Sequence, residues 1–419
     1  MAEHGGHDAG HDGPAPVTDW ARDFDHLHPA YNANVHAIWD ELRGTCPVAR
    51  TERYGGTWLP VRHDDVSAIA YDTTHFSSMA VVVSPIKPTG ELRPMGGAPP
   101  ITSDPPFHHH ARRVLLPAFA PQKVSRMEHE VREFCHDLID RMGDADVVDA
   151  ADQYAKHIPP AVIAHMLDLP LEDGEIFRDF VHTALESQAE SIETREAGWK
   201  RMEEYIDGHM RARAANLGDD LLSYLLSVQV EGKNLSHEHV RGTIVLMLVA
   251  GIDTTWSGIG STLWHFAGHR NDLERLTAEP DLLPTAIEEM LRAYAPVTMA
   301  RIVVEDVEVG GCPMKPGDWT LLPFPAANRD PAAFDRADEV IIDREINRHA
   351  AFGLGIHRCI GSNLARMEMR VALDTFTQRF PAFHLADPTA VTWSVGQVRG
   401  PRSLPIRIER RAARPASLR

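Results

Sequence analysis

Apolar side chains recur at helical spacing along most of the chain. Over residues 32–44, Val35, Ile38 and Leu42 fall on one face, which is typical of an amphipathic helix packed on a core. Shorter apolar runs, such as residues 57–61 after a Gly-Gly turn, predict strands. The chain is therefore expected to be mainly α with a smaller β-rich region. Further helices are predicted over residues 63–70, 124–141, 153–168, 174–190, 197–215, 221–228, 236–268, 283–294 and 361–380, and further strands at 303–304, 307–309 and within 391–406.

The predicted helix over residues 236–268 carries polar groups next to its most apolar part. Residues 244–252 are apolar on nearly all faces, which indicates burial on every side, and Asp253 and Thr254 follow directly. A buried acid is costly unless it is satisfied or used, and a mid-helix threonine can bond the carbonyl four residues back, here that of Ala250. The pattern has two interpretations: a kinked core helix with a paired acid, or a functional acid–hydroxyl pair.

Three glycines and one cysteine crowd into residues 352–361, directly before a predicted helix. Glycine lets the backbone turn sharply and approach a large flat partner closely. The helix dipole and free N–H groups near Cys359 favour a thiolate, which is a soft iron ligand. The alternatives are an unreactive buried cysteine, or half of a zinc site with His357. A structural zinc needs four ligands in paired short spacings, and no second pair lies nearby.

Charge and cysteine content narrow the function classes. The 42 basic and 60 acidic residues give a net charge of −18, which argues against nucleic acid or an anionic membrane as main partner. The four cysteines lie far apart, which fits a reducing, cytoplasmic setting. The start has no apolar signal core, and the longest apolar run, residues 244–250, is too short to span a membrane. We expect a soluble enzyme with one domain over residues 17–409, between a disordered tail (1–16) and a frayed end (410–419).

Three segments carry a resemblance to a known family. The loop from Phe352 to Gly361 resembles the haem-binding loop of the cytochrome P450 monooxygenases, Phe-Gly-x-Gly-x-His-x-Cys-x-Gly, at every specified position. The segment from Ala250 to Thr254 is similar to the family's oxygen-activation signature, and a Glu-x-x-Arg pair at Glu289 lies between the two, in family order. The resemblance covers most of the chain. It implies the cytochrome P450 fold and a haem b cofactor with an axial cysteine thiolate.

The resemblance also implies roles for individual residues. Asp253 and Thr254 would be catalytic, delivering protons during oxygen activation. Glu289, Arg292 and Arg344 would form a structural triad that holds the haem loop. The residues expected to contact the haem are Cys359 as the iron ligand, His108, Arg112, Arg301 and His357 as propionate donors, and Phe352, Ala250 and Gly361 beside it.

Family position and apolar character together indicate a substrate pocket. The loop over residues 81–100, rich in proline and glycine, matches the family's loop that roofs the pocket. Terpenoids, fatty acids, steroids and small aromatics all fit such a pocket. Thr298 and Arg93 could each offer a polar anchor or face away. The residues expected to line the pocket are Val82, Leu246, Val249, Val297, Thr298, Met299 and Val395.

The expected reaction is hydroxylation, or O- or N-dealkylation, of an apolar small molecule by a haem-thiolate monooxygenase using O2. The sequence has no flavin or nicotinamide fingerprint, so electrons are expected from a ferredoxin, a ferredoxin reductase and NAD(P)H. Arg112, Arg113, Arg348 and Arg358 form a basic island where an acidic ferredoxin could dock. No nucleic-acid or membrane partner is expected. Two alternatives stay open: a peroxide-driven haem-thiolate peroxygenase, and a non-catalytic haem protein that senses or carries a ligand.

Overall fold

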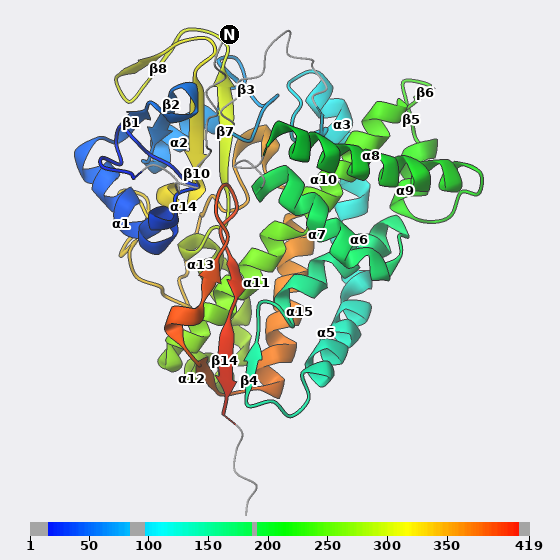
Figure 1. Ribbon diagram of the computed structural model, residues 1–419, viewed down its shortest axis with the longest axis vertical. Helices are drawn as coiled ribbons and strands as arrows, with labels where there is room; N and C mark the ends of the chain where they lie inside the picture. The colour runs from blue at the N-terminus through cyan, green and yellow to red at the C-terminus, as the bar shows by residue number, and fades with distance from the viewer. Residues whose placement is uncertain (1–15, 84–96, 187–190, 410–419) are drawn as a thin grey trace, which may run out of the picture.

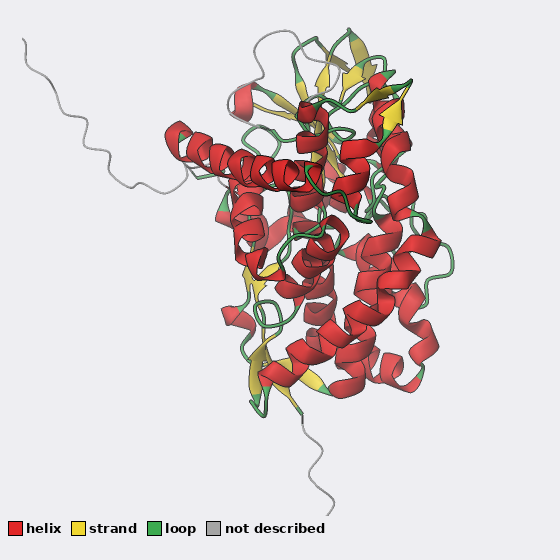
Figure 2. Ribbon diagram, turned by 90° about the vertical axis from the view of Figure 1, so that its right-hand side faces the viewer, coloured by secondary structure: helices red, strands yellow, loops and turns green. Residues whose placement is uncertain are grey.

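The computed structural model describes residues 16–83, 97–186 and 191–409, and it confirms a mainly helical protein (Figure 1). Strands gather toward two ends of the molecule, with helices between them (Figure 2). Both predicted tails, Arg93 and most of the predicted lid loop lie outside the described residues. The α-helices are α1 (Pro29–Thr45), α2 (His63–Tyr71), α3 (Phe107–Leu115), α4 (Pro121–Val124), α5 (Glu128–Met142), α6 (Ile158–Leu167), α7 (Gly174–Val181), α8 (Ile192–Ala214), α9 (Leu221–Ser227), α10 (His237–Ala250), α11 (Asp253–Gly268), α12 (Arg270–Ala278), α13 (Leu283–Ala293), α14 (Phe324–Ala327) and α15 (Ser362–Arg379).

The main sheet has five strands in the order β1-β2-β10-β7-β3. It joins distant parts of the chain, because β10 pairs in parallel with β2 and antiparallel with β7. A second, three-stranded sheet has the order β11-β14-β4. The predicted strand at 303–304 proves to be the end of a longer strand, β7. The strands are β1 (Val48–Thr51), β2 (Thr57–Pro60), β3 (Phe76–Ser77), β4 (Val147–Asp149), β5 (Gln229–Val230), β6 (Lys233–Asn234), β7 (Thr298–Val303), β8 (Val307–Val309), β9 (Cys312–Met314), β10 (Trp319–Pro323), β11 (Phe383–Leu385), β12 (Thr392–Trp393), β13 (Pro401–Ser403) and β14 (Pro405–Ile408).

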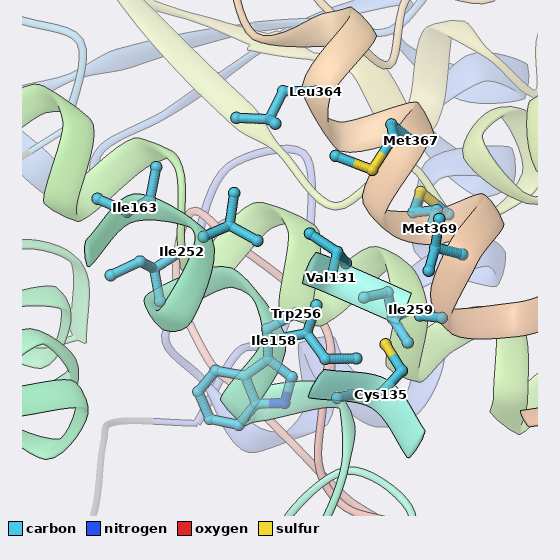
Figure 3. Packing of buried hydrophobic residues seen from close by; sticks show 14 of the residues in the cluster. Val131, Cys135, Ile158, Ile163, Ile252, Trp256, Ile259, Leu364, Met367 and Met369 are labelled. Atoms are coloured by element: carbon cyan, nitrogen blue, oxygen red, sulfur yellow. The ribbon is translucent and has the colours of Figure 1, made fainter. Parts of the chain in front are cut away.

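The largest hydrophobic core lies among the helices, away from the main sheet. Figure 3 shows Val131 and Cys135 of α5 beside Ile259 of α11 and Met369 of α15. All four side chains are at most 5% exposed, so α15 is held on several sides by close packing. This matters for function because α15 begins at Ser362, just after Cys359, and its position sets where that cysteine lies.

The single helix predicted over 236–268 is wrong: the structure has two helices with a break at Gly251 and Ile252. Ser236 caps the first of them, accepting a hydrogen bond from the His239 backbone N–H at 3.1 Å. By length and composition, the run His237–Gly268 could cross a membrane, with a mean hydropathy of 1.4. However, 72% of its apolar window is buried inside the protein, which is the environment of a core helix.

Glu289, Arg292 and Arg344 meet in a buried network before the cysteine loop, as predicted. Arg292 donates to both oxygens of Glu289 at 2.9 Å, and Arg344 Nε donates at 2.9 Å. The backbone N–H of Ile341 and the amide of Asn347 also donate to this carboxylate, at 2.8 and 3.0 Å. Burial alone would raise the pKa of Glu289, but the two arginines hold it below its usual value. One carboxylate therefore ties α13 to the chain that leads into the loop.

Removing this carboxylate should destabilise the protein strongly. Glu289→Ala leaves Arg292 charged and fully buried, and breaking such a pair costs about 3–5 kcal/mol. Urea unfolding should show a much lower midpoint for this variant. Glu274→Ala is the matched control, because its ion pair with Arg270 is exposed and should contribute little. Similar midpoints for the two variants would contradict a structural role for Glu289.

Candidate active site

One side of α10 is accessible although the helix runs through the core. Leu246, Val249 and Ala250 are only partly covered, and Thr254 at the start of α11 continues the row, whereas most of their neighbours are buried. Spacings of three and four residues place these side chains on one helix face. Protein interiors are close-packed, so we infer that this accessible row forms the wall of an internal space.

The break between α10 and α11 lies beside this row. Thr254 Oγ1 donates to the carbonyl of Ala250 at 2.8 Å, which is the back-bond predicted from the sequence. At Gly251, an added Cβ would lie 2.7 Å from the carbonyl oxygen of Met247 and 2.8 Å from Ile163, so a larger residue would force a shift. The glycine and the threonine together account for the local loosening of the helix.

Asp253 is fully buried at the start of α11 and, in the part of the chain that the structure describes, has one ion-pair partner. Arg402 Nη2 lies 2.7 Å from Oδ1, an ion-pair contact without the angle of an in-line hydrogen bond. Burial raises the pKa of Asp253 to about 6; Arg402 acts in the opposite direction, and the charge of Glu186 adds to the rise. An acid with such a pKa can accept and release a proton near neutral pH.

The cysteine loop is a tight, glycine-dependent turn that closes on itself. The Cys359 backbone N–H donates to the carbonyl of Phe352 at 2.7 Å. Gly355 has a positive φ of 65°, and a side chain there would overlap the carbonyl of Ala70. Arg366 of α15 lies over the Phe352 ring at 4.3 Å from its centroid, which fixes the start of the loop to the helix that follows it.

Cys359 is accessible to solvent, yet protein surrounds it closely enough for burial to raise the pKa of its thiol. The backbone N–H of Gly361 and the nearby Arg112, Arg358 and Arg366 lower that pKa, but by less than burial raises it. The Gly361 N–H therefore favours the thiolate, as predicted for free N–H groups here, but burial outweighs this effect in the protein alone. A bound metal would supply the missing stabilisation, because metal binding drives a cysteine to its thiolate form.

The four predicted propionate donors are basic and lack anionic partners. His108 and His357 lie with ring centroids 4.4 Å apart, and neither ring nitrogen of His108, nor Nε2 of His357, has a hydrogen-bond partner. Arg301 is 5% exposed, and within the described ranges its one hydrogen bond goes to the carbonyl of Ala300. Among the described residues, neither Arg301 nor Arg112 has a carboxylate within ion-pair distance.

This unpartnered cluster fits an anionic cofactor. Burial lowers the pKa of His108 to about 4, of His357 to about 2 and of Arg301 to about 10, and neighbouring cations lower the histidine values further. Buried donors left without acceptors destabilise a fold, and carboxylate groups would satisfy them. The residues present therefore fit the two carboxylates of a haem, with the Cys359 sulfur as the metal ligand.

The predicted pocket residues do not all share one face. In β7 and the residue before it, Val297 and Met299 are partly accessible, whereas Thr298 between them is buried. Because strand side chains alternate, Thr298 points the other way, into a small cavity beside Tyr31 and Tyr294. The geometry does not bring Thr298 together with the predicted pocket residues on this strand.

Two further pocket segments meet at the same place. Gln397 Nε2 donates to the Val81 carbonyl at 3.3 Å, and Val297 pairs with Val398 in an isolated bridge. The segments that carry Val82 and Val395 therefore lie beside the start of β7. Both valines are partly accessible, as a pocket lining requires.

Sequence reasoning missed Arg402 and Glu186, the two charged groups nearest to Asp253. Arg402 lies in β13 and Glu186 follows α7, so both are far from Asp253 along the chain. Neither stands in a motif, and an arginine near the end of a basic, strand-like segment looks like a surface residue. The one signal in the sequence was that Asp253 was expected to be buried while its own helix offered no cation to pair with it, which pointed to a partner elsewhere in the chain.

The comparisons with known proteins agree with this geometry. A profile of the cytochrome P450 family matches residues 190–391. The chain is 34% identical over 390 residues to the nocardicin C N-oxygenase of Nocardia uniformis subsp. tsuyamanensis, covering 91% of this chain and 95% of that protein. It is 32% identical over 396 residues to the mycinamicin IV hydroxylase/epoxidase of Micromonospora griseorubida, covering 90% and 98%. The structure of CYP109E1 from Bacillus megaterium in complex with testosterone superposes with a TM-score of 0.83 at 29% identity, covering 90% of this chain and 98% of that one. The chain belongs to the cytochrome P450 family, whose membership implies a haem-thiolate centre, and is an oxygenase of that family.

Proposed function

We propose that this oxygenase binds haem b through Cys359 and uses O2 and external electrons to hydroxylate or dealkylate an apolar small molecule. One observation carries the proposal: an accessible cysteine sulfur shares one loop with His357, which contacts the unpartnered His108. A sulfur ligand and carboxylate-seeking donors so placed match the two chemical ends of an iron porphyrin. When bound, that group supplies the oxygen activation and electron transfer that no side chain of this protein can provide.

The protein's own residues would hold the cofactor, shield the reacting face from water and deliver protons to it. His108, Arg112, Arg301 and His357 would bind the two haem carboxylates and so orient the ring. The row on α10 that includes Leu246 would exclude water from the reacting face. We assign no proton-handling role to these residues.

Proton delivery is the role that we assign to Asp253 and Thr254. Asp253 has a pKa of about 6, and the hydroxyl of the next residue reaches the accessible row at Ala250. The acid would receive protons from the solvent side, and the threonine hydroxyl would present them to the pocket. This pair favours a reaction with O2 and electrons over a peroxide-driven one, because peroxide already brings its protons.

The substrate is proposed to be a largely apolar organic molecule. Val297, Met299, Leu246 and Val249 present partly accessible apolar surface toward the proposed pocket. The related enzymes act, by their names, on nocardicin C and mycinamicin IV, and a similar structure holds testosterone. Recording the shift of the haem Soret band with terpenoids, fatty acids, steroids and small aromatics would identify the class.

A ferredoxin is proposed as the electron donor. Arg113, Arg348 and Arg358 are exposed, and among the described residues none of them has a carboxylate within ion-pair distance. Arg112 is different: it is partly buried beside Cys359 and belongs to the inner cluster, not to the docking surface. Exposed arginines without carboxylate partners, on an otherwise acidic protein, would attract an acidic partner.

Reversing one charge on this surface should slow reduction. Arg358→Glu is expected to lower the rate of reduction by an acidic ferredoxin and to flatten its dependence on ionic strength, because one attractive contact becomes repulsive. Stopped-flow reduction over a range of salt measures both effects. Arg379→Glu, at the exposed far end of α15, is the control. An unchanged rate and salt slope would remove Arg358 from the interface.

Reduced protein exposed to carbon monoxide should show the absorption band typical of sulfur-ligated haem. Cys359→Ser should lose that band, because a serine oxygen is a poor iron ligand. Cys135→Ser is the matched control, since Cys135 is fully buried in the helical core and should leave the band in place. A band that survives in Cys359→Ser would overturn the assignment of the ligand.

The stability of the protein should depend on pH through Asp253. Its pKa rises from 3.8 to about 6 on folding, so the folded state favours the protonated form. The ionised form therefore lowers the free energy of unfolding. This loss is absent below pH 3.8 and fully present above pH 6, where it is on the order of 3 kcal/mol. Asp253→Asn should therefore gain stability relative to the parent as pH rises from 4 to 7. The difference in urea midpoint between Asp253→Asn and the parent, followed from pH 4 to pH 7, measures this gain, and a difference that does not change with pH would contradict it.

A further inference from the structure

Arg402 lies between two carboxylates from different parts of the chain. Its Nη2 atom is 2.7 Å from Asp253 Oδ1 and 2.6 Å from Glu186 Oε1, and its Nε donates to the same Glu186 oxygen at 3.2 Å. The exposed fractions of the side chains are 0% for Asp253, 18% for Arg402 and 24% for Glu186. The three groups therefore form a short path from the buried acid outward.

The strand that carries Arg402 is pressed onto α11. A side chain at Gly400 would overlap Ser257, and a Cβ on Gly260 would lie 3.3 Å from Pro401. The guanidinium of Arg402 then stacks 4.1 Å from the centroid of Trp256. The guanidinium is thus held between the Trp256 ring and the two carboxylates, which it contacts at the same time, and its Nη1 also donates to Ser257 Oγ at 3.5 Å.

Glu186 belongs to a segment of irregular helix. Residues His182–Glu186 form a π-helical turn that directly follows α7, and such turns often occur at functional sites. His182, with a side chain 51% exposed, lies with Nδ1 3.2 Å from the second oxygen of Glu186. Among the described residues, Arg402 and Glu186 are the charged groups that act on Asp253, and His182 acts through Glu186.

We propose that Arg402 is the positioning residue of the catalytic acid, shared between Asp253 and Glu186, so that the two carboxylates compete for one cation. This inference rests on the proton-delivering role proposed for Asp253. When the guanidinium turns toward Glu186, Asp253 loses its counter-charge and takes up a proton more readily. When the guanidinium turns back, Asp253 becomes more acidic and gives the proton up.

The competition also links the acid to the π-helical turn. A displacement of residues His182–Glu186 moves Glu186 relative to Arg402 and so changes the proton affinity of Asp253. Arg402 itself stays charged throughout, since an arginine does not deprotonate in proteins. It is therefore not a proton carrier, and its effect is electrostatic and positional.

Two substitutions should shift the titration of Asp253 in opposite directions. In the haem-loaded enzyme, Arg402→Gln removes the attracting cation and should raise the pKa of Asp253 by about one to three units. Glu186→Gln removes the competing anion, so that Arg402 pairs with Asp253 only, and the pKa of Asp253 should fall. Arg402→Lys keeps the charge and should restore part of the parent value. A role in folding alone would not produce opposite shifts.

Two measurements read this titration. The first is the infrared band of the protonated Asp253 carboxyl, identified as the band that Asp253→Asn removes, followed against pH. The second is the pH profile of substrate oxidation, whose Asp253-dependent limb should move with the band. Arg407→Gln, at an exposed arginine of the neighbouring strand β14, is the control and should move neither.

The outcomes separate the two proposals. If Asp253→Asn leaves the pH profile unchanged, the proton-delivering role fails, and the inference about Arg402 falls with it. If Asp253→Asn removes the limb but neither Arg402→Gln nor Glu186→Gln moves the band or the limb, only the inference about Arg402 is overturned. Should Arg402→Gln fail to fold, the sign of the shift in Glu186→Gln decides alone.

Discussion

The position of the cysteine loop depends on one buried carboxylate. Glu289 accepts hydrogen bonds from Arg292 on its own helix, from Arg344, and from the backbone and side chain of residues 341 and 347 that lead into the loop. Without it, the segment before the loop would lose these bonds and keep its other contacts with α13, from Arg292 to the carbonyls of Ala337 and Glu339 and from Glu288 to His349. A buried ion pair often contributes little net stability compared with well-packed apolar residues, but losing one partner leaves the other charge buried and unpaired. The geometric effect of Glu289 is to hold together groups from α13 and from the chain that leads into the loop.

The second constraint is the packing of α15 in the helical core. Met369 and its neighbours are fully enclosed, so the N-terminal end of α15 cannot drift. Glu289 holds the loop from one side and α15 from the other, and Cys359 lies between them. A sulfur atom that must approach a large rigid ring needs this support from both sides, because a displacement of about one ångström in a site impairs its function.

Local patterns predicted much of this molecule because the relevant physics is local. The spacing of apolar residues predicted most of the longer helices, although α12 was missed and the helix predicted over 174–190 is α-helical only to Val181. The back-bond from Thr254 to Ala250 needs only a four-residue separation. A kink near Thr254 was one of the two interpretations of the sequence, but a full break at Gly251 and Ile252 was not predicted, because the contacts of Gly251 with Met247 and Ile163 depend on the fold. The cysteine loop was predicted from a resemblance, whereas the roles of its basic neighbours stay proposals.

Long-range pairs and the directions of side chains could not be predicted. Thr298 was placed in the pocket with Val297 and Met299, yet strand alternation turns it away once the register is fixed. Arg402 and Glu186 stand in no motif, and they meet Asp253 only because the last strands of the chain fold back onto α11. Sequence spacing carries no information about such contacts.

The polar groups that this fold leaves unsatisfied are its most informative feature. In a well-packed interior, nearly every buried donor finds an acceptor, so exceptions need a cause. Among the described residues, such exceptions occur in several places, two of which belong to the candidate site: both ring nitrogens of His108 and Nε2 of His357 have no partner, and Asp253 has only the ion-pair contact of Arg402, which it shares with Glu186. The unpartnered histidine nitrogens fit a bound anion. The sharing of one cation helps to keep the pKa of Asp253 near neutral pH. Both groups break a packing rule where the proposed chemistry would use the break, and functional sites are where such violations are expected.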